Sequence, residues 1–323
     1  MKSISTTLKG VKLMPDYNNS FSVMVNKEIS DHVKSWKFII IVALILLTTF
    51  ASIYSILNLI KNNAAVINQE DNFLFLKLFT ATTGSIPNFM TLISFLGPIL
   101  GIALGFDLVN SEQNQGTISR VLSQPIPRDY FITSKFAAAI SLVFLLVFSI
   151  GFLVMGAGLI SIGLPPTLGE FLRIFIFLFL SGVYIAFWLN LGILFSIIFK
   201  QSATSALASL AVWLFFTVFY SMLVNITARS IASNPFDLRS LTAALSRLSP
   251  NYLYNELTTI LLTPSIRTLG GLSFKQLQGA IPSTLSLDQS LILVWPHFTA
   301  LIAASLICFA VSYLSFMRKE VRA

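Results

Sequence analysis

The sequence has very few charged residues for its length. Only 11% of its 323 residues are Asp, Glu, Lys or Arg, whereas a soluble domain usually has about 25%. Hydrophobic residues make up 55%, phenylalanine alone occurs 29 times, and the mean hydropathy is +0.81. These values exclude an ordinary soluble domain and predict a polytopic membrane protein.

Residues that commonly carry chemistry are also scarce. The single cysteine, Cys308, lies inside an apolar run, which excludes a disulfide framework and a thiolate metal site. His32 and His297 have no ligand-like neighbours in the sequence, and we interpret both as packed or interfacial rings. There is no Gly-x-x-x-x-Gly-Lys-Ser/Thr loop, and no paired carboxylates or Ser-His pattern lie beside the apolar runs. We therefore expect no catalytic site and no P-loop nucleotide site.

The few charges are placed where membrane topology would place them. The net charge is +8, but the basic residues gather beside apolar runs, so we expect no nucleic-acid partner. Charged residues are nearly absent from the centres of these runs. A proton- or ion-coupled transporter usually has an ionisable relay there, so we expect its energy to come from elsewhere.

Six apolar runs are long enough to cross about 30 Å of hydrocarbon as helices. They extend over residues 38–60, 88–106, 136–160, 170–199, 202–228 and 289–317. The first begins too far into the chain, and is too long, to be a signal peptide. The predicted fold is an all-α bundle of six transmembrane helices at residues 36–317, with a short tail at 318–323 and a tight turn at 163–166.

The N-terminal segment, residues 1–35, contains an amphipathic stretch that begins at Phe21 and continues to Lys37. Five apolar residues of this stretch can share one helix face: Phe21, Met24, Val25, Ile29 and Val33. This pattern predicts a helix lying in the membrane interface before the chain enters the bilayer.

Basic residues favour one side of the membrane. The N-terminal segment through Lys37 has six lysines, and the loop 107–135 has Arg120, Arg128 and Lys135. The short loops on the other side hold only Lys61, Lys77 and Arg173. The positive-inside rule therefore places both termini and the loop 107–135 in the cytoplasm.

Two segments on the opposite side carry their own structure signals. Residues 71–80 are rich in Phe and Leu but too short to span, so we expect them at the outer interface. The loop 229–288 contains Asn234-Pro235 and Ser249-Pro250, each an N-cap residue followed by Pro at the first helical position. We expect two short outer helices there, either capping a translocation path or packing on the outer leaflet.

The loop 107–135 is a polar island between two apolar runs. After Gly116, Thr117 can cap a short helix in which Ile118, Val121 and Leu122 share one face, and Pro125 stops it. Ser119, Arg120, Ser123 and Gln124 cover the other face. A helix of two turns is unstable alone, so this one needs a surface to dock on, either lipid or another protein.

This loop resembles the signature loop of ABC-2 type permeases, in particular the group that includes the nitrous-oxide-reductase maturation permease. Glu112, Gly116-Thr117, the segment from Ser123 to Arg128, and Lys135 match it without gaps. The resemblance implies an elbow helix before the first span and a coupling helix that seats on a partner ATPase. The coupling residues it implies are Glu112, Gly116, Thr117, Ile118, Arg120, Val121, Leu122, Pro125 and Arg128.

The resemblance further implies a permease subunit of an ATP-driven exporter in the cytoplasmic membrane of a prokaryote. Two ATPase subunits would hold the ATP and Mg²⁺, and a second copy or a homologue would complete the permease in the membrane lipid. Two alternatives stay open: a mechanotransmission subunit that drives an extracytoplasmic maturation partner, and a stand-alone channel or scaffold. The sequence does not specify the substrate.

Three glycines form a doubled Gly-x-x-x-Gly pattern in the second apolar run: Gly97, Gly101 and Gly105. Their spacing places them on one helix face, which allows another helix backbone to approach closely. That helix could belong to the same chain or to a second copy in a dimer.

Overall fold

The structure, a computed structural model, describes residues 17–62, 73–81, 86–116, 127–163, 165–232, 234–264 and 285–318. Among these residues six helical segments are long and apolar enough to cross a membrane. They are Trp36–Asn58, Phe89–Asn114, Arg128–Ser161, Leu168–Ile198, Ser202–Ile231 and Leu287–Arg318. The prediction of an all-α polytopic membrane protein with six spans is confirmed.

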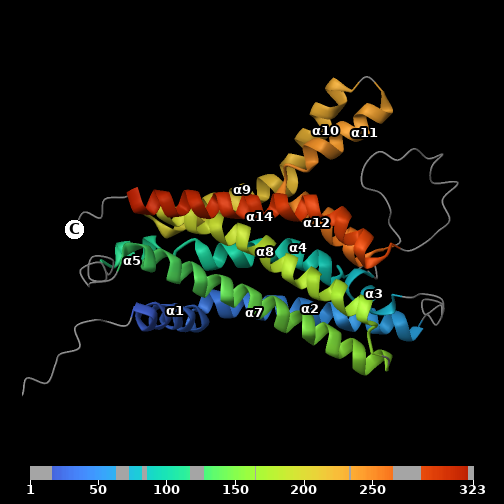
Figure 1. Cartoon of the computed structure of the whole chain (residues 1–323), viewed down its shortest axis with the longest axis horizontal. Coiled ribbons are helices and arrows are strands. Elements are labelled where there is room, and N and C mark those ends of the chain that lie inside the picture. The colour runs from blue at the N-terminus through green and yellow to red at the C-terminus, as the bar shows by residue number, and fades with distance from the viewer. Residues whose placement is uncertain are drawn as a thin grey trace, which may run out of the picture.

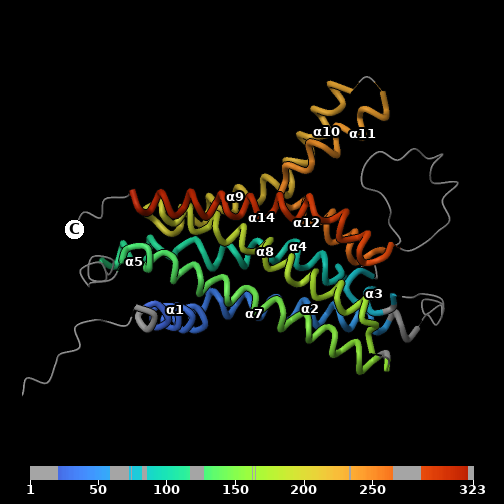
Figure 2. The backbone as a smooth tube through the Cα atoms, in the orientation of Figure 1, coloured from blue at the N-terminus to red at the C-terminus, as the bar shows by residue number. Residues whose placement is uncertain are grey.

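The long helices lie side by side in an elongated bundle (Figure 1). Its main elements are α1 (Tyr17–Lys34), α2 (Trp36–Asn62), α4 (Phe89–Gly105), α7 (Arg128–Ile162), α8 (Leu168–Ile198) and α14 (Leu287–Arg318). One end of the bundle carries α1 and α5 (Asn110–Asn114), and the other carries α3 (Leu74–Thr80) (Figure 2). We call these the α5 end and the α3 end.

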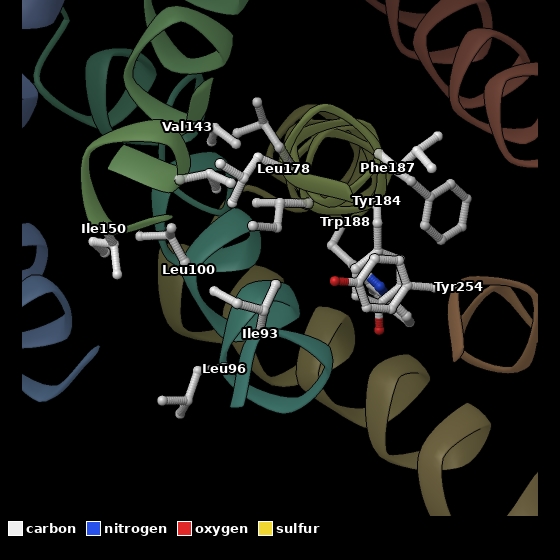
Figure 3. Close-up of a cluster of buried hydrophobic side chains, with 14 of the residues drawn as sticks. Ile93, Leu96, Leu100, Val143, Ile150, Leu178, Tyr184, Phe187, Trp188 and Tyr254 are labelled. Atoms are coloured by element: carbon white, nitrogen blue, oxygen red, sulfur yellow. The ribbon is translucent and has the colours of Figure 1, made fainter. Parts of the chain in front are cut away.

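Helix α8 forms the centre of the bundle. Its side chains are apolar around the whole circumference, which is typical of a helix buried on all sides. Phe177, Leu178 and Trp188 of α8 are completely buried. Leu178 faces α7 at Gly151, whose missing side chain leaves room for it. Figure 3 shows Tyr184 stacked on Tyr254, with ring centroids 4.1 Å apart. Helices α4, α7, α9, α12 and α14 all pack directly against α8, whereas α1 and α2 pack on α7 and α4.

The three glycines of α4 face α8 of the same chain. A Cβ atom added at Gly101 would lie 2.5 Å from the carbonyl oxygen of Ile185, and one at Gly105 would lie 2.5 Å from that of Leu189. Because these close neighbours are backbone atoms, no side-chain movement could make room. The Gly-x-x-x-Gly pattern therefore brings the α4 and α8 backbones into direct contact within one subunit.

The turn between α7 and α8 lies where the sequence predicts it. Gly163, with φ +77°, ends α7 in the left-handed conformation that glycine adopts most readily. Thr167 and Glu170 form a reciprocal capping box that begins α8. Glu170 also accepts a hydrogen bond of 2.8 Å from the backbone N–H of Phe75, which ties α3 to α8.

Helix α3, within the segment expected at the outer interface, packs against the end of the bundle. Phe75, Leu76, Leu78 and Phe79 are all buried, and α3 packs against α4, α7, α8 and α12. Its two polar residues, Lys77 and Thr80, share one face and are partly exposed, while the apolar face packs into the bundle. It is part of the core at the α3 end.

The fifth span bends where the sequence suggests a continuous helix. It consists of α9 (Ser202–Leu214), a π-helical turn η2 (Phe215–Phe219) and α10 (Tyr220–Ile231). Helix α10 forms a hairpin with α11 (Pro235–Ser246), and the hairpin leans away from the bundle (Figure 1). The bend is attributable to η2, because a π turn interrupts the regular hydrogen-bond ladder.

The two short helices of the 229–288 loop have different environments. Both begin with Pro at the first position as predicted, although neither Asn234 nor Ser249 makes a side-chain capping bond. Helix α11 has no buried residues, whereas α12 (Pro250–Leu262) buries most of its length against α8 and α14. Only α12 is therefore integrated into the bundle.

Replacing Gly101 by Ala tests the backbone contact between α4 and α8. We expect Gly101→Ala to destabilise the purified protein by about 1–3 kcal/mol, because the added methyl group overpacks two backbones. Gly156→Ala in α7 is the matched control, since nothing lies within 4 Å of its added Cβ. Thermal unfolding in detergent checks this, and equal melting temperatures for the two variants would contradict the packing described.

Candidate functional site

A cavity of about 310 Å³ opens at the α5 end between α1, α2, α5 and α7. Its lining is unusually rich in ionisable groups for this chain: Lys27, Glu28, Asp31, His32, Lys37, Asp107, Glu112 and Lys135. We call these eight residues the charge cluster. Because the rest of the bundle is mainly apolar, this cluster is the leading candidate for a functional site.

Lys135 of α7 is the centre of the charge cluster. Its side chain is only 3% exposed, and its Nζ lies 2.9 Å from Glu28 Oε2 of α1 and 2.6 Å from Glu112 Oε1 of α5. The ammonium group also lies 5.1 Å from the centroid of the Phe131 ring. A buried ammonium group requires such partners, because removing it from water alone is costly. Lys135 therefore joins three helices at one point.

A second ion pair also links different helices at the α5 end. Lys37, at the beginning of α2, contacts both carboxylate oxygens of Asp107, just beyond the end of α4. Its Nζ lies 5.0 Å from the centroid of the Phe106 ring. The two pairs together connect α1, α2 and α7 on one side with α4 and α5 on the other.

Lys27 lies at the more exposed rim of the cluster. Its Nζ is 3.5 Å from Glu28 Oε1, 3.7 Å from Asp31 Oδ2 and 3.9 Å from Glu112 Oε1. Partial burial opposes its charge, but the three carboxylates outweigh that effect and raise the pKa of Lys27. Lys27 therefore remains a cation that links the α1 surface to α5.

His32 is the one member of the cluster that burial keeps neutral. Burial lowers its pKa to about 4, and nearby Lys37 adds to the effect. Its Nε2 has no hydrogen-bond partner among the described residues. At neutral pH the ring is uncharged, so α1 presents Glu28 as the only buried charge to Lys135.

The α5 side of the loop 107–135 is fixed by hydrogen bonds to the α8–α9 connection. The Ser196 hydroxyl accepts from the backbone N–H of Val109 at 3.0 Å, and Asn114 donates 3.0 Å to the carbonyl of Lys200. Gly116, with φ +67°, follows α5, and α7 begins at Arg128, which is exposed. The two described ends of the loop 117–126, Gly116 and Pro127, therefore border the α5 end of the bundle.

The structure places only part of the predicted coupling site. Glu112 pairs with Lys135, while Gly116 and Arg128 flank the loop. The other predicted residues lie outside the described part of the chain: Thr117, Ile118, Arg120, Val121, Leu122 and Pro125. The short helix there stays a prediction.

Sequence reasoning missed the contribution of α1. Its buried positions include Glu28 and His32, whereas Val33, expected on the apolar face, is 45% exposed. The position of Glu28 within an apolar stripe, between Met24 and Ile29, is the pattern that could have revealed it. A carboxylate on the packed face of a helix needs a buried cation opposite, and Lys135 supplies it.

The family of the chain is now clear. The family model described as "ABC-2 family transporter protein" matches residues 23–321, which is nearly the whole chain and includes the entire charge cluster. This chain belongs to the ABC-2 transporter family. No curated protein matches it. As an ABC-2 membrane domain it is the permease component of an ABC transporter, and such permeases work with ATPase partners. The closer grouping with the nitrous-oxide-reductase maturation permease stays a prediction.

Removing the central ammonium group should destabilise this ABC-2 permease. We expect Lys135→Met to cost about 3–5 kcal/mol, because it leaves the largely buried Glu28 and Glu112 with only the exposed and more distant Lys27 as a cation. Lys34→Met, at an exposed α1 position, is the control. Adding Glu28→Gln and Glu112→Gln to Lys135→Met should recover much of the lost stability. Unfolding that does not distinguish Lys135→Met from Lys34→Met would refute a structural role for Lys135.

The neutral state of His32 predicts a pH effect. Because its pKa is lower in the folded chain than its ordinary 6.5, its contribution to stability is full above about pH 6.5. That contribution is lost as the pH falls toward 4, since the unfolded chain binds the proton more tightly. His32→Gln should therefore lose less stability than wild type between neutral and mildly acidic pH. Parallel stability curves for the two proteins would argue against this assignment.

Proposed function

We propose that this chain is the permease subunit of an ATP-driven exporter, and that its partner ATPase acts on the loop 117–126. The observation that carries the proposal is the Glu112–Lys135 contact of 2.6 Å, which clamps together the two helices that border this loop. A displacement applied to the loop would therefore move α5 and α7 together. Without that clamp, the loop could move while the helices stayed in place.

The charge cluster distributes such a displacement over the inner part of the bundle. Glu28 couples α1 to Lys135, and Lys37 couples α2 to Asp107. The energy of a partly buried ion pair depends strongly on its geometry. Such pairs therefore hold the helices in one arrangement, but they can also exchange partners when the helices move. We assign them the role of transmitting the ATPase stroke into the membrane helices.

The α4–α8 contact would transmit this displacement to the other side of the membrane. Gly101 and Gly105 hold the α4 backbone against α8, and α8 packs against α12 near the α3 end. Two helices in backbone contact move as one body, so a shift at the α5 end would reach α12 about a bilayer thickness away. Helix α12 is accordingly our candidate for the outer gate.

The orientation follows from the distribution of basic residues. Lys27, Lys37, Arg128 and Lys135 lie at the α5 end, and the lysine-rich N-terminal sequence leads into it, so we assign this end and both chain termini to the cytoplasm. The α3 end then faces outward. In this proposal two permease chains and two ATPases form the transporter in a prokaryotic cytoplasmic membrane, and the ATPases hold ATP and Mg²⁺.

Gentle purification of the tagged chain from its native membrane tests the proposal. Mass spectrometry should find a P-loop ATPase in a ratio close to one to one. Arg120→Glu should lower the recovered ATPase by about tenfold or more, because it reverses a charge on the predicted docking helix. Arg239→Glu, an equal charge change on exposed α11, should leave recovery unchanged.

Each alternative gives a different result in the same preparation. A wild-type preparation without any ATPase would overturn the exporter proposal and favour a channel or scaffold. An ATPase together with a stoichiometric extracytoplasmic protein would favour force transmission to that partner. Full ATPase recovery with Arg120→Glu would move the docking site away from the loop.

A further inference from the structure

Arg173, in the second turn of α8, is a charged residue in an almost completely buried position. It is only 1% exposed. Its guanidinium group donates from Nη1 to the carbonyl of Leu261 and to Oγ of Ser290, both at 2.9 Å, and from Nη2 to the carbonyl of Leu285 at 2.8 Å. Its Cζ atom lies 5.6 Å from the centroid of the Phe73 ring. Because a guanidinium group is costly to bury unless its donors are bonded, these acceptors make the position possible.

The three acceptors lie where two elements at the α3 end begin or finish. Leu261 belongs to the last turn of α12, where carbonyl groups have no partner within the helix. Ser290 belongs to the first turn of α14. Leu285 lies shortly before α14, and its backbone N–H donates to the carbonyl of Pro264 at 3.1 Å. Arg173 therefore joins the end of α12 and the beginning of α14 to α8.

The beginning of α8 is itself fixed at the α3 end. Glu170, one turn before Arg173, takes part in the capping box of α8 and accepts 2.8 Å from the backbone N–H of Phe75 in α3. The same stretch of α8 thus contacts α3 through a carboxylate, and α12 and α14 through a guanidinium group. Helix α8 also packs along α4, which leads to Asp107 of the charge cluster. A displacement of α8 would therefore reach the Leu261 carbonyl directly through Arg173.

The hydrogen bonds of Arg173 differ from the apolar contacts around them in what they can transmit. Apolar attraction has no preferred direction, so packed side chains can slide while they stay buried. A hydrogen bond depends on distance and angle, and the planar guanidinium group holds its donors in a fixed arrangement. A displacement of α8 therefore either moves the Leu261 carbonyl with it or breaks the bond.

Two other hydrogen-bonded contacts join α12 to α8 nearer the beginning of α12. Tyr184 donates to Asn251 Oδ1 at 2.7 Å, and the hydroxyl oxygens of Ser181 and Tyr254 lie 2.7 Å apart. These contacts do not involve Arg173. A substitution at Arg173 can thus release the end of α12 while the rest of the helix stays attached to the bundle.

We propose that Arg173 is a positioning residue through which α8 moves the end of α12 and the beginning of α14 together. The inference rests on the proposed function, in which α8 transmits the ATPase stroke and α12 is the outer gate. Arg173 acts on the gate through the Leu261 carbonyl, while its bonds to Leu285 and Ser290 make the first turn of α14 follow. The two elements thus change position in one step rather than independently.

Arg173→Lys tests this role, because lysine keeps the charge but has one nitrogen where two nitrogens of arginine now bond. The gate is followed by maleimide labelling of Thr258→Cys, a completely buried position of α12, in a Cys308→Ser background. Labelling is measured with and without ATP in the purified complex of permease and ATPase. Arg239→Lys, the same exchange at an exposed position of α11, is the matched control.

We expect Arg173→Lys to reduce the ATP-induced change in labelling rate by about threefold or more, because charge-assisted hydrogen bonds to the gate are lost. The recovery of ATPase and its rate of ATP hydrolysis should match those of Arg239→Lys, since the α5 end of the permease is unchanged. A role confined to the stability of the fold would not separate the gate from the ATPase in this way.

Three results would contradict the inference, and they are distinguishable. An ATP response in Arg173→Lys equal to that in Arg239→Lys would overturn the role of Arg173 and leave the proposed function intact. A joint loss of labelling response, ATPase recovery and hydrolysis in Arg173→Lys would show that Arg173 only supports the fold. The absence of an ATP response even in Arg239→Lys would refute the proposed function, and this inference with it.

A second variant decides the matter if Arg173→Lys does not fold. Ser290→Ala removes one acceptor and leaves Arg173 bonded to both carbonyl groups. We expect it to reduce the ATP response of Thr258→Cys by about twofold, because the guanidinium group is then less firmly fixed. An unchanged response in Ser290→Ala would overturn the inference.

Discussion

The structure depends on one buried charge, the ammonium group of Lys135. It is nearly inaccessible to water, so its two carboxylate partners are a condition for burying it. Those partners, Glu28 and Glu112, come from helices separated by most of the first third of the chain. A single residue therefore fixes where the N-terminal helix lies and how the loop between the second and third spans begins. In an otherwise apolar protein, this is the point at which a force from outside the membrane can enter the fold.

Apolar packing between the long helices connects the charge cluster with the opposite end of the bundle. Helix α8 buries most of its residues, and the glycines of α4 bring the α4 backbone against it. Close-packed helices transmit small shifts because they have few voids to absorb them. At the α3 end α8 meets α12, which polar contacts from Arg173, Tyr184 and His297-bound Glu256 hold in place. The molecule thus has charge networks at both ends and a stiff apolar connection between them.

Much of the architecture could be predicted because it depends on local sequence. The six spans follow from run length, the α7–α8 turn from Gly163 and the prolines, and the starts of α11 and α12 from Pro235 and Pro250. The ion pairs that define the charge cluster could not be predicted from local sequence, since Glu28 lies 107 positions from Lys135. The π-helical bend of η2 and the burial of α3 also depend on tertiary packing rather than on local propensity.

The proposed function requires Glu112 and Lys135 to connect the loop 117–126, the proposed ATPase contact, with the outer helix α12. The most direct measurement is the effect of ATP on maleimide labelling of Thr258→Cys, a completely buried position of α12, in a Cys308→Ser background. The purified complex is compared with and without Glu112→Ala. Lys135 keeps its contact with Glu28 in Glu112→Ala, so the bundle should stay folded. We expect ATP to change the labelling rate when Glu112 is present and to have little effect in Glu112→Ala. An ATP response of equal size in both proteins would contradict it.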